Sequence, residues 1–382
     1  MQKYQPGRRE FLIGLAGTAA AIAGRPEAAA APAFMYVGSF TGEGRGHGEG
    51  LSVFRRSGES APWTRVQLLK DLADPSFLII DRQGRFLYSA HADGTEATAY
   101  QIDQASGQLK VLNRQPTGGR NGVHLAIDAT GRCLVVANYA TGTVAVLPIN
   151  QDGSLAPLSD LATLSGTPGP HRTQQESSHP HHCPFDRTGR VVVVPDKGLD
   201  KVFVYRLDAA RGKLVAGNPP DVTSRAGAAP RHADFHPTQP YVYVINELDS
   251  TITVYRFTLD AGRLEPLQVV TTLPTSYTGN NSGAEIAVAP SGRFLYGSNR
   301  GHDSIAMFAI DRASGLLTAN GWEPTQGKTP RFFGLDPTGT HLYAANQNSD
   351  SVVIFRINQP TGKLTPTGET VKVASPTTIV FR

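Results

Sequence analysis

The chain has 382 residues, few charged side chains (18%) and many glycines (40) and prolines (27). This composition favours many short strands joined by tight turns over long helices. The formal net charge is +4, and the first 31 residues carry about half of it. The rest of the chain therefore offers no basic surface of the kind that would indicate a nucleic-acid partner.

Residues 1–31 resemble an export signal rather than part of a fold. Arg8 and Arg9 precede a Phe-Leu pair and a run of small and apolar residues, and Ala28–Ala31 offers a cleavage site of the A-x-A type. A twin arginine of this kind is typical of a Tat signal, which is read by the Tat export machinery. The apolar run is shorter than the roughly 20 residues that a spanning helix needs. We therefore expect a periplasmic protein without a stable membrane anchor.

One structural unit recurs along the rest of the chain. It consists of a short apolar run, a turn of the D-x-T-G type, a second run, a polar corner and a third run. Successive turns are 47, 58, 50, 53 and 47 residues apart. A steady period of this length with several strands per unit is the signature of a β-propeller. The turns are marked by Gly84, Gly131, Gly189, Gln239, Gly292 and Gly339.

The two ends of the chain supply the pieces of one more unit. Ala33–Ser39 matches a second run that no first run precedes, and Pro376–Phe381 matches a first run that nothing follows. Joining them closes a ring and removes exposed sheet edges. We predict an all-β fold, a single seven-bladed β-propeller over residues 34–382 with four-stranded blades and a ring closed by strands from both termini. Since a closed ring has no edge to pair, we expect a monomer.

Two local features modify the repeat. Turns of the S-G-x-L type precede a weaker fourth run, and their glycines, such as Gly107 and Gly315, should adopt a positive φ at hairpin corners. The longest spacing is due to an irregular insert at Ser159–Ser178. This insert either covers the histidines that follow it or forms a plain surface loop.

Aligning the repeats shows two columns that diverge into reactive side chains, whereas scaffold positions should look alike. One column lies at the start of the innermost run and the other at the end of the run that follows. Because these strands are antiparallel and the innermost lines the channel, both columns should surround one channel mouth. The first column is Ser76, Val123, His181, Arg231, Ala284, Arg331 and Thr377, and the second is Phe40, Ala92, Tyr139, Lys197, Glu247, Arg300 and Gln347.

Four members of these columns are the predicted catalytic residues: His181, Arg231, Glu247 and Arg300. Two arginines without an acidic cluster indicate an anionic or carbonyl-bearing ligand, because guanidinium grips such oxygens in pairs. Histidine and glutamate offer proton transfer. We expect four further members to contact the substrate: Arg331, Gln347, Lys197 and Tyr139.

Metal binding is the alternative for the histidines near residue 180. Neighbouring residues of a strand point to opposite faces, so at most His179 and His181, or His182 with a residue of another blade, could share an ion. We therefore predict no metal. Cys133 and Cys183 lie at different points of two repeats, so a disulfide between them is not expected. The positions after the first column should face away from the mouth and hold neighbouring blades together: His124, His182, His232 and Glu285.

Four sequence stretches resemble the seven-bladed propeller lactonase family, namely HPHHCPFDRTGR, GAAPRHADFHPTQPYVYVINELDSTITVY, SGAEIAVAPSGRFLYGSNRGHDSIAMF and TPRFFGLDPTG. This family includes bacterial 6-phosphogluconolactonase and, more distantly, the fungal 3-carboxy-cis,cis-muconate lactonizing enzyme. The resemblance covers nearly the whole chain after residue 34. The site of the muconate enzyme maps onto His181 of HPHH, Arg231 of PRH, Glu247 of NEL and Arg300 of NRG.

The resemblance implies that the protein opens a sugar lactone to the aldonic acid without a cofactor. It implies His181 as general base or acid, arginines that hold an anionic group or the oxyanion, and Glu247 as the residue that orients His181 or an arginine. A lactone-forming cycloisomerase and a non-catalytic periplasmic binding propeller remain as alternatives. The phosphogluconolactonases of this family are cytoplasmic, so an export signal makes a free sugar lactone or another lactone a plausible substrate.

Overall fold

The described residues form seven antiparallel sheets, and within each the strands run in order from the centre to the rim. The computed structural model describes residues 1, 31–58, 61–260 and 262–382, so the predicted export signal lies almost wholly outside the described residues. The first three blades contain β27 (Pro376–Phe381), β1 (Phe34–Ser39), β2 (Leu51–Arg55) and β3 (Thr64–Leu69); β4 (Pro75–Ile80), β5 (Phe86–His91), β6 (Glu96–Ile102) and β7 (Leu109–Pro116); and β8 (Gly122–Ile127), β9 (Cys133–Asn138), β10 (Thr143–Pro148) and β11 (Asp160–Thr163).

The remaining four blades continue the ring in chain order. They contain β12 (Val191–Asp196), β13 (Lys201–Asp208) and β14 (Lys213–Thr223); β15 (Pro230–Phe235), β16 (Tyr241–Asn246), β17 (Thr251–Thr258) and β18 (Arg263–Thr271); β19 (Ser282–Val288), β20 (Phe294–Arg300), β21 (Ser304–Ile310) and β22 (Leu317–Pro324); and β23 (Pro330–Leu335), β24 (His341–Asn346), β25 (Ser351–Ile357) and β26 (Leu364–Lys372). Two 3₁₀ turns, η1 (Tyr139–Thr141) and η2 (Gln347–Ser349), follow β9 and β24.

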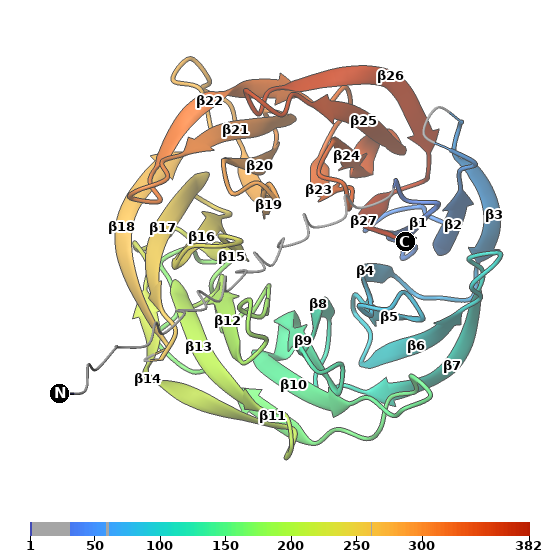
Figure 1. Ribbon diagram of the computed structural model, residues 1–382, viewed down its shortest axis with the longest axis horizontal. Coiled ribbons are helices and arrows are strands. Elements are labelled where there is room, and N and C mark those ends of the chain that lie inside the picture. The colour runs from blue at the N-terminus through green and yellow to red at the C-terminus, as the bar shows by residue number, and fades with distance from the viewer. Residues whose placement is uncertain (2–30, 59–60, 261) are drawn as a thin grey trace.

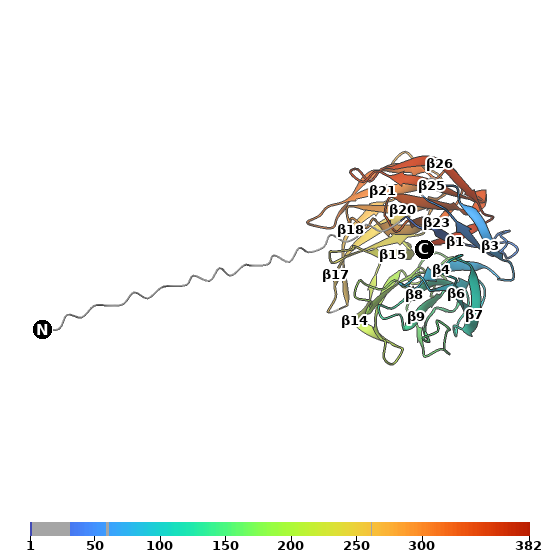
Figure 2. The ribbon, with the colours of Figure 1, turned by 45° about the vertical axis from the view of Figure 1, so that its right-hand side comes forward.

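The blades surround a central channel, which confirms the predicted propeller (Figure 1). The innermost strands, such as β4, β8, β15 and β19, lie around the centre of the ring, and the outermost strands form its rim. Figure 2 shows the ring turned, with β3, β7, β14 and β26 still at the periphery. The predicted closure is also confirmed, since β27 pairs with β1 in antiparallel register from Met35↔Phe381 to Ser39↔Pro376.

The fourth blade departs from the regular pattern at its innermost strand. The segment 180–185 joins β12 only through isolated bridges, Pro180↔Asp196 and Phe185↔Val192. Proline has no N–H to donate to a sheet ladder, and the segment contains two prolines, Pro180 and Pro184. The irregular inner edge of this blade is the part of the ring that carries His181.

The regular inner strands of the other blades each begin with a β-bulge. Pro230 of β15 pairs with Asn246 of β16, and the next pair is His232 with Ile245. The β15 side of this step therefore holds one more residue than the β16 side. The extra residue is Arg231, a member of the first predicted column. The extra residues of β4, β8, β23 and β27 belong to the same column. A bulge disrupts the strict alternation of side chains and redirects them at a functional site.

Neighbouring blades are joined by a repeated contact between a tyrosine and a hairpin glycine. The hydroxyl of Tyr36 donates to the carbonyl of Gly107 in the next blade over 2.9 Å. Gly107 has φ +71, as predicted, and a Cβ there would come within 2.2 Å of the Phe34 ring. This position therefore needs glycine for both its backbone conformation and its close packing. The same contact recurs between Tyr88 and Gly153, Tyr243 and Gly315, and Tyr296 and Gly362.

The hydrophobic core lies between adjacent blades. Val135 of the third blade and Val192 of the fourth, for example, belong to one fully buried cluster. Cys133 and Cys183 belong to the same cluster as free thiols, as predicted. Among the described residues there is no helix whose length and apolar character would let it cross a membrane.

Candidate active site

A cavity of about 240 Å³ occupies one mouth of the channel, where the two predicted columns meet. Its wall is built from the bulged starts of the inner strands and the ends of the strands beside them. All predicted site residues except Gln347 line it, and the lining comprises Phe40, Arg45, Ser76, Phe77, Ala92, Asn121, Val123, Tyr139, His181, Lys197, Arg231, His232, Glu247, Arg300, Arg331, Phe332 and Thr377.

The structure does not place Gln347 as the sequence predicted. Gln347 is the first residue of the turn η2. Its side-chain amide donates to the carbonyl of Arg45 over 3.2 Å, and the side chain does not line the cavity. Arg45 lines the cavity instead of Gln347. It lies in the loop after β1 and forms an ion pair with Asp93. This loop has no counterpart in the other repeats, so column alignment could not find Arg45.

Glu247 is the centre of the charged wall. Its Oε1 lies 2.9 Å from Nζ of Lys197 and 3.2 Å from a terminal nitrogen of Arg300. Its Oε2 lies 3.0 Å from Nε of Arg231, without the alignment of a hydrogen bond. Burial alone would raise the pKa of Glu247, but the charges of Arg300, Lys197 and Arg231 hold it well below its ordinary range. The carboxylate is thus ionised and neutralises part of the surrounding positive charge.

The cavity keeps more positive charge than Glu247 can balance. Arg331 stacks on the ring of Phe40, with 5.0 Å from its guanidinium carbon to the ring centre, and has no ion pair among the described residues. Burial, and then the charges of Arg231 and Arg300, lower its pKa. The buried Nε of Arg300 also has no hydrogen-bond partner in the described part of the chain. An anion bound here would relieve this repulsion and satisfy the unpaired donor.

His181 lies on the cavity wall as a neutral imidazole. Its backbone N–H donates to the carbonyl of Pro195 over 3.0 Å, and its ring meets the ring of Tyr139 edge-on, with centroids 5.5 Å apart. Burial and the charge of Arg231 push its pKa well below the ordinary value of 6.5, against the opposing effect of Glu247. Its Nε2 has no hydrogen-bond partner among the described residues. The ring therefore has one nitrogen available to a ligand.

The hydrogen-bond partner of His181 is His232, and Glu247 instead pairs with Arg231 and Arg300, the second alternative that the sequence analysis gave for it. No hydrogen bond joins His181 to Glu247 in the described chain, whereas Nδ1 of His181 lies 3.2 Å from Nε2 of His232. The sequence analysis placed His232 away from the mouth because side chains alternate along a strand. The bulge at Arg231 breaks this alternation, so both Arg231 and His232 line the cavity. Equivalent bulges in β4 and β23 explain why the sequence analysis did not predict Phe77 and Phe332 as residues that line the cavity.

The histidine layer, which we define as His124, His182, His232 and Glu285, lies behind the cavity wall except for His232, which also lines the cavity. Each member contacts the inner segment of a neighbouring blade, as predicted. Nδ1 of His124 lies 3.2 Å from the thiol of Cys183, and Nδ1 of His182 accepts from the N–H of Ala233 over 3.2 Å. Burial lowers the pKa of all three histidines, that of His124 to about 3.

The insert at Ser159–Ser178 has two parts. Residues 160–163 form β11, the outer strand of the third blade, so this part is more regular than expected. The remainder reaches the cavity wall, where Oε1 of Gln174 accepts from Nζ of Lys197 over 2.6 Å. Gln175 is buried and donates to the carbonyl of Lys197 over 2.8 Å. The insert thus fixes one of the cations that line the cavity.

Tyr139 lines the cavity beside His181 and Lys197. Its ring stacks on His179, with centroids 4.4 Å apart and planes at 7°, and burial raises the pKa of its hydroxyl to about 12. Nδ1 of His179 lies 3.0 Å from the carbonyl of Tyr139. His179 thus holds the tyrosine ring and is not among the residues that line the cavity.

Comparison with known proteins agrees with this geometry. The family described as "Lactonase, 7-bladed beta-propeller" matches residues 34–381. A 6-phosphogluconolactonase of Bacillus subtilis is 36% identical over 304 residues, which are 79% of this chain and 84% of that protein. One of Formosa agariphila is 33% identical over 309 residues, 79% of this chain and 86% of that protein. The solved periplasmic gluconolactonase of Pseudomonas aeruginosa superimposes with a TM-score of 0.84 at 31% identity, over 91% of this chain and 98% of that one. The chain belongs to the seven-bladed β-propeller lactonase family.

Proposed function

We propose that the protein hydrolyses a sugar lactone to the aldonic acid, with His181 as the group that moves the proton. The observation that carries this proposal is Nε2 of His181, which has no hydrogen-bond partner among the described residues and lies in a cavity lined by five cationic side chains and one carboxylate. A neutral imidazole beside guanidinium groups suits a reaction that removes a proton from water and places negative charge on a carbonyl oxygen.

The reaction follows from these positions. Nε2 of His181 takes a proton from a water molecule as the water oxygen forms a bond to the lactone carbonyl carbon. The carbonyl oxygen gains the negative charge, which Arg231 and Arg300 stabilise. The bond from the carbonyl carbon to the ring oxygen then breaks. The proton on His181 passes to that ring oxygen, which leaves as a hydroxyl group of the aldonic acid.

The substrate we propose is a free sugar lactone. The cavity is small, and Arg331 and Arg45 can bind sugar oxygens as well as the carboxylate of the product. The relatives named above include both 6-phosphogluconolactonases and a periplasmic gluconolactonase. The twin-arginine motif at Arg8 and Arg9 favours the periplasmic alternative for this chain.

A panel of lactones tests the function. Mature protein, treated with a chelator, is assayed with glucono-1,5-lactone, 6-phosphogluconolactone and a muconolactone, and the spontaneous hydrolysis rate is subtracted. Preferred turnover of the free sugar lactone is the expected result. Turnover of the phosphorylated lactone alone would keep the hydrolase and correct the substrate. No turnover of any member would overturn the enzyme assignment in favour of a binding propeller.

We also propose that residues 1–31 are a Tat signal, that residues 34–382 are the exported domain, and that the mature protein is a periplasmic monomer. The support is the motif at Arg8 and Arg9 and the periplasmic relative. Changing both arginines to lysine should retain the protein in the cytoplasmic fraction. Light scattering on the mature protein should give the mass of a single chain, and a dimer mass would contradict the monomer.

A further inference from the structure

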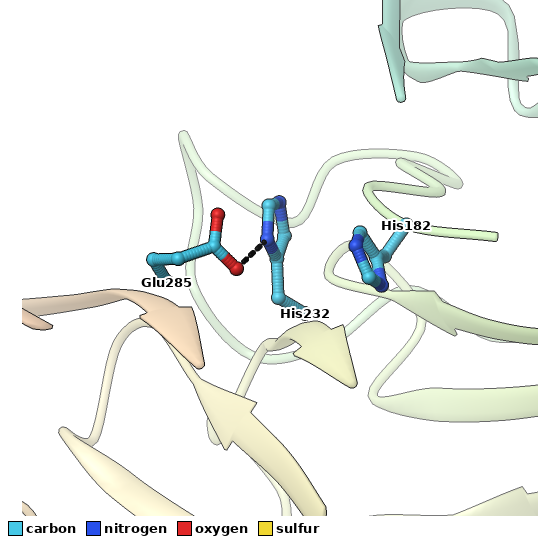
Figure 3. Close-up of side chains that lie close together, drawn as sticks. All are labelled: His182, His232 and Glu285. Atoms are coloured by element: carbon cyan, nitrogen blue, oxygen red, sulfur yellow. Dashed lines mark hydrogen bonds and ion pairs between the residues drawn. The ribbon is translucent and has the colours of Figure 1, made fainter. Parts of the chain in front are cut away.

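Three buried side chains form a continuous line that begins at the cavity. Nδ1 of His181 lies 3.2 Å from Nε2 of His232, and Nδ1 of His232 lies 2.9 Å from Oε1 of Glu285. They come from the inner edges of the fourth, fifth and sixth blades in succession. Figure 3 shows the carboxylate of Glu285 pointing at the ring of His232. The line ends at Glu285, which borders a second cavity, separate from the one that His181 lines.

The surroundings of His181 disfavour a positive charge on its ring. The side chains of His181 and His232 are both buried, and Arg231, Arg331 and Lys197 lie near enough to lower the pKa of His181 further. If His181 kept the proton as an imidazolium ion, a new cation would form in a low-dielectric site that is already positive. The proton taken from water needs another destination.

We propose that His232 and Glu285 are positioning residues that pass this proton away from His181, so that Glu285 is the final acceptor. This inference rests on the proposed lactone hydrolysis and assigns the second half of its proton transfer. The arrangement follows the logic of a catalytic triad, in which a carboxylate sets the tautomer of an imidazole. Here two imidazoles stand between the reacting water and the carboxylate.

The transfer balances without any charged histidine. At the start Glu285 is a carboxylate, Nδ1 of His232 carries a proton, and Nδ1 of His181 carries a proton. When Nε2 of His181 takes a proton from water, the proton on its Nδ1 moves to Nε2 of His232, and the proton on Nδ1 of His232 moves to Glu285. Both rings end neutral in the opposite tautomer. The reverse transfer delivers the proton to the leaving ring oxygen.

The environment of Glu285 suits this role. Its Oε1 also accepts from the backbone N–H of Ile286 over 3.0 Å, while Oε2 is buried without a partner among the described residues. Burial raises the pKa of Glu285 to about 8, the charge of Arg231 opposes this rise and the charge of Asp234 adds to it. The other titratable groups nearby are His124, His182 and Arg331. A carboxyl group of this pKa can accept a proton near neutral pH and release it again.

The same residues also form the group of potential metal ligands His182, His232 and Glu285. Their atoms are arranged for other contacts. The rings of His182 and His232 stack at 21° with centroids 4.2 Å apart, so they meet through their faces (Figure 3). Nδ1 of His182 accepts from Ala233, and both nitrogens of His232 already face hydrogen-bond partners. This geometry fits a proton line and not a coordination shell.

The test compares Glu285→Gln with a matched control, Asp234→Asn. Asp234 is a neighbouring buried acid that borders the same second cavity, but its carboxylate accepts only from backbone N–H groups. Glu285→Gln keeps an amide oxygen that can accept from both His232 and Ile286, as Oε1 does in the parent protein, but the amide cannot take up a proton. We expect kcat to fall about 10²-fold or more, since exchanging the carboxylate of a triad for an amide costs up to about 10⁴-fold. KM should change little, and Asp234→Asn should stay within a few-fold of the parent protein.

Two further readouts separate a proton line from a structural role. In the parent protein kcat/KM should rise with pH through the pKa of Glu285, about 8, because the carboxylate is the active form. This limb should be lost in Glu285→Gln. Nitrogen NMR should show the proton of His181 moving from Nε2 to Nδ1 as the pH rises through this value, and this change should be absent in Glu285→Gln.

The outcomes distinguish this inference from the proposed function. If no lactone is turned over, the function fails, while the NMR titration still tests the line. If lactones are turned over and Glu285→Gln keeps the parent kcat and pH profile, the line is wrong. Should Glu285→Gln fail to fold, His232→Phe keeps the stack on His182 and breaks the line. Parent-like kcat in His232→Phe would overturn the inference equally.

Discussion

The cavity wall and the histidine layer behind it are both buried, yet they carry charge in different ways. In the wall, Glu247 is ionised because three cations surround it, and its charge is fixed across the ordinary pH range. In the layer, no such set of counter-ions exists among the described residues, and burial drives the histidines and Glu285 toward their neutral forms. A buried side chain thus stays charged where counter-ions surround it, as in the wall. Where counter-ions are lacking, as in the layer, burial shifts its pKa toward the neutral form.

The largest expected effect comes from the residue at the border of these two regions. His181→Ala removes a ring that lines the cavity and contacts His232 of the layer, so the wall keeps its charge but loses the group that moves the proton. We expect kcat for the best lactone to fall about 10²–10⁴-fold, the usual contribution of a general base. Substrate affinity should change far less. The measurement is steady-state kinetics at the pH optimum of the parent protein.

A ring of similar shape provides the control for that variant. His179→Ala removes a histidine that stacks on Tyr139 without lining the cavity. Its effect should fall mainly on KM, through the position of the tyrosine. Equal losses of kcat in the two variants would sink the assignment of His181.

The charged wall can be broken at its centre. Glu247→Gln leaves Arg231, Arg300 and Lys197 without their shared counter-charge. Breaking a buried ion pair costs about 3–5 kcal/mol of folding stability, because the remaining charge stays buried. We expect a matching loss of stability in urea unfolding at pH 7. Added phosphate should restore more stability to this variant than to the parent protein.

The exposed pair of Glu265 and Arg256 supplies the contrast. Glu265→Gln changes a carboxylate to an amide on the surface, where an ion pair contributes only about 0–1 kcal/mol. A loss in Glu247→Gln as small as in Glu265→Gln would mean that the wall is not organised around its carboxylate.

Much of the cavity wall could be predicted from the sequence, because residues that differ between the repeats stand out when the repeats are aligned. Divergent columns located His181, Arg231 and Glu247, and the paired half-units at both ends gave the closure of the ring. The alternation rule failed at the bulges, since one extra residue per inner strand turns two neighbours toward the channel. His232 was therefore assigned to the wrong side.

Other features lie outside what a repeat can reveal. Arg45 comes from a loop that occurs once, so no aligned copy marks it. Gln347 occupies a column position, but the turn η2 directs its side chain to the backbone of Arg45. The line to Glu285 needs distances between three blades, which no spacing along the chain supplies.

The unpaired cation of the wall should determine how tightly anionic substrates bind. Arg331→Met keeps a long apolar side chain over Phe40 and removes the charge. We expect KM for a lactone with an anionic group to rise about 10- to 100-fold, equivalent to about 1.4–3 kcal/mol. KM for a neutral sugar lactone should rise less. Arg293 stacks on Phe294 outside the cavity, so Arg293→Met should leave both constants unchanged.

The histidine layer should make the fold sensitive to acid. Its histidines have lowered pKa values in the folded protein, so the unfolded chain binds more protons below the ordinary pKa of 6.5. The contribution of the histidines is therefore complete above pH 6.5 and falls as the pH drops below it, by up to about 1.4 kcal/mol per pH unit for each histidine, while the raised pKa of Glu285 offsets the slope of one histidine. Urea unfolding from pH 7.5 to 4.5 measures this slope. His124→Asn should make it shallower, whereas the exposed His47→Gln should not.

The smallest expected effect concerns the insert, which touches the wall but not the layer. Gln174 is exposed except for its contact with Nζ of Lys197, so Gln174→Ala removes one hydrogen bond and leaves the lysine paired with Glu247. One such bond to a charged group contributes about 1.5–3 kcal/mol at most, and less at an exposed position. We expect KM to rise a few-fold with kcat unchanged, and Gln174→Glu, which can still accept from the lysine, to stay close to the parent. A change in kcat instead would mean that the insert acts on the proton transfer, and the separation between a charge-holding wall and a proton-moving layer would not hold.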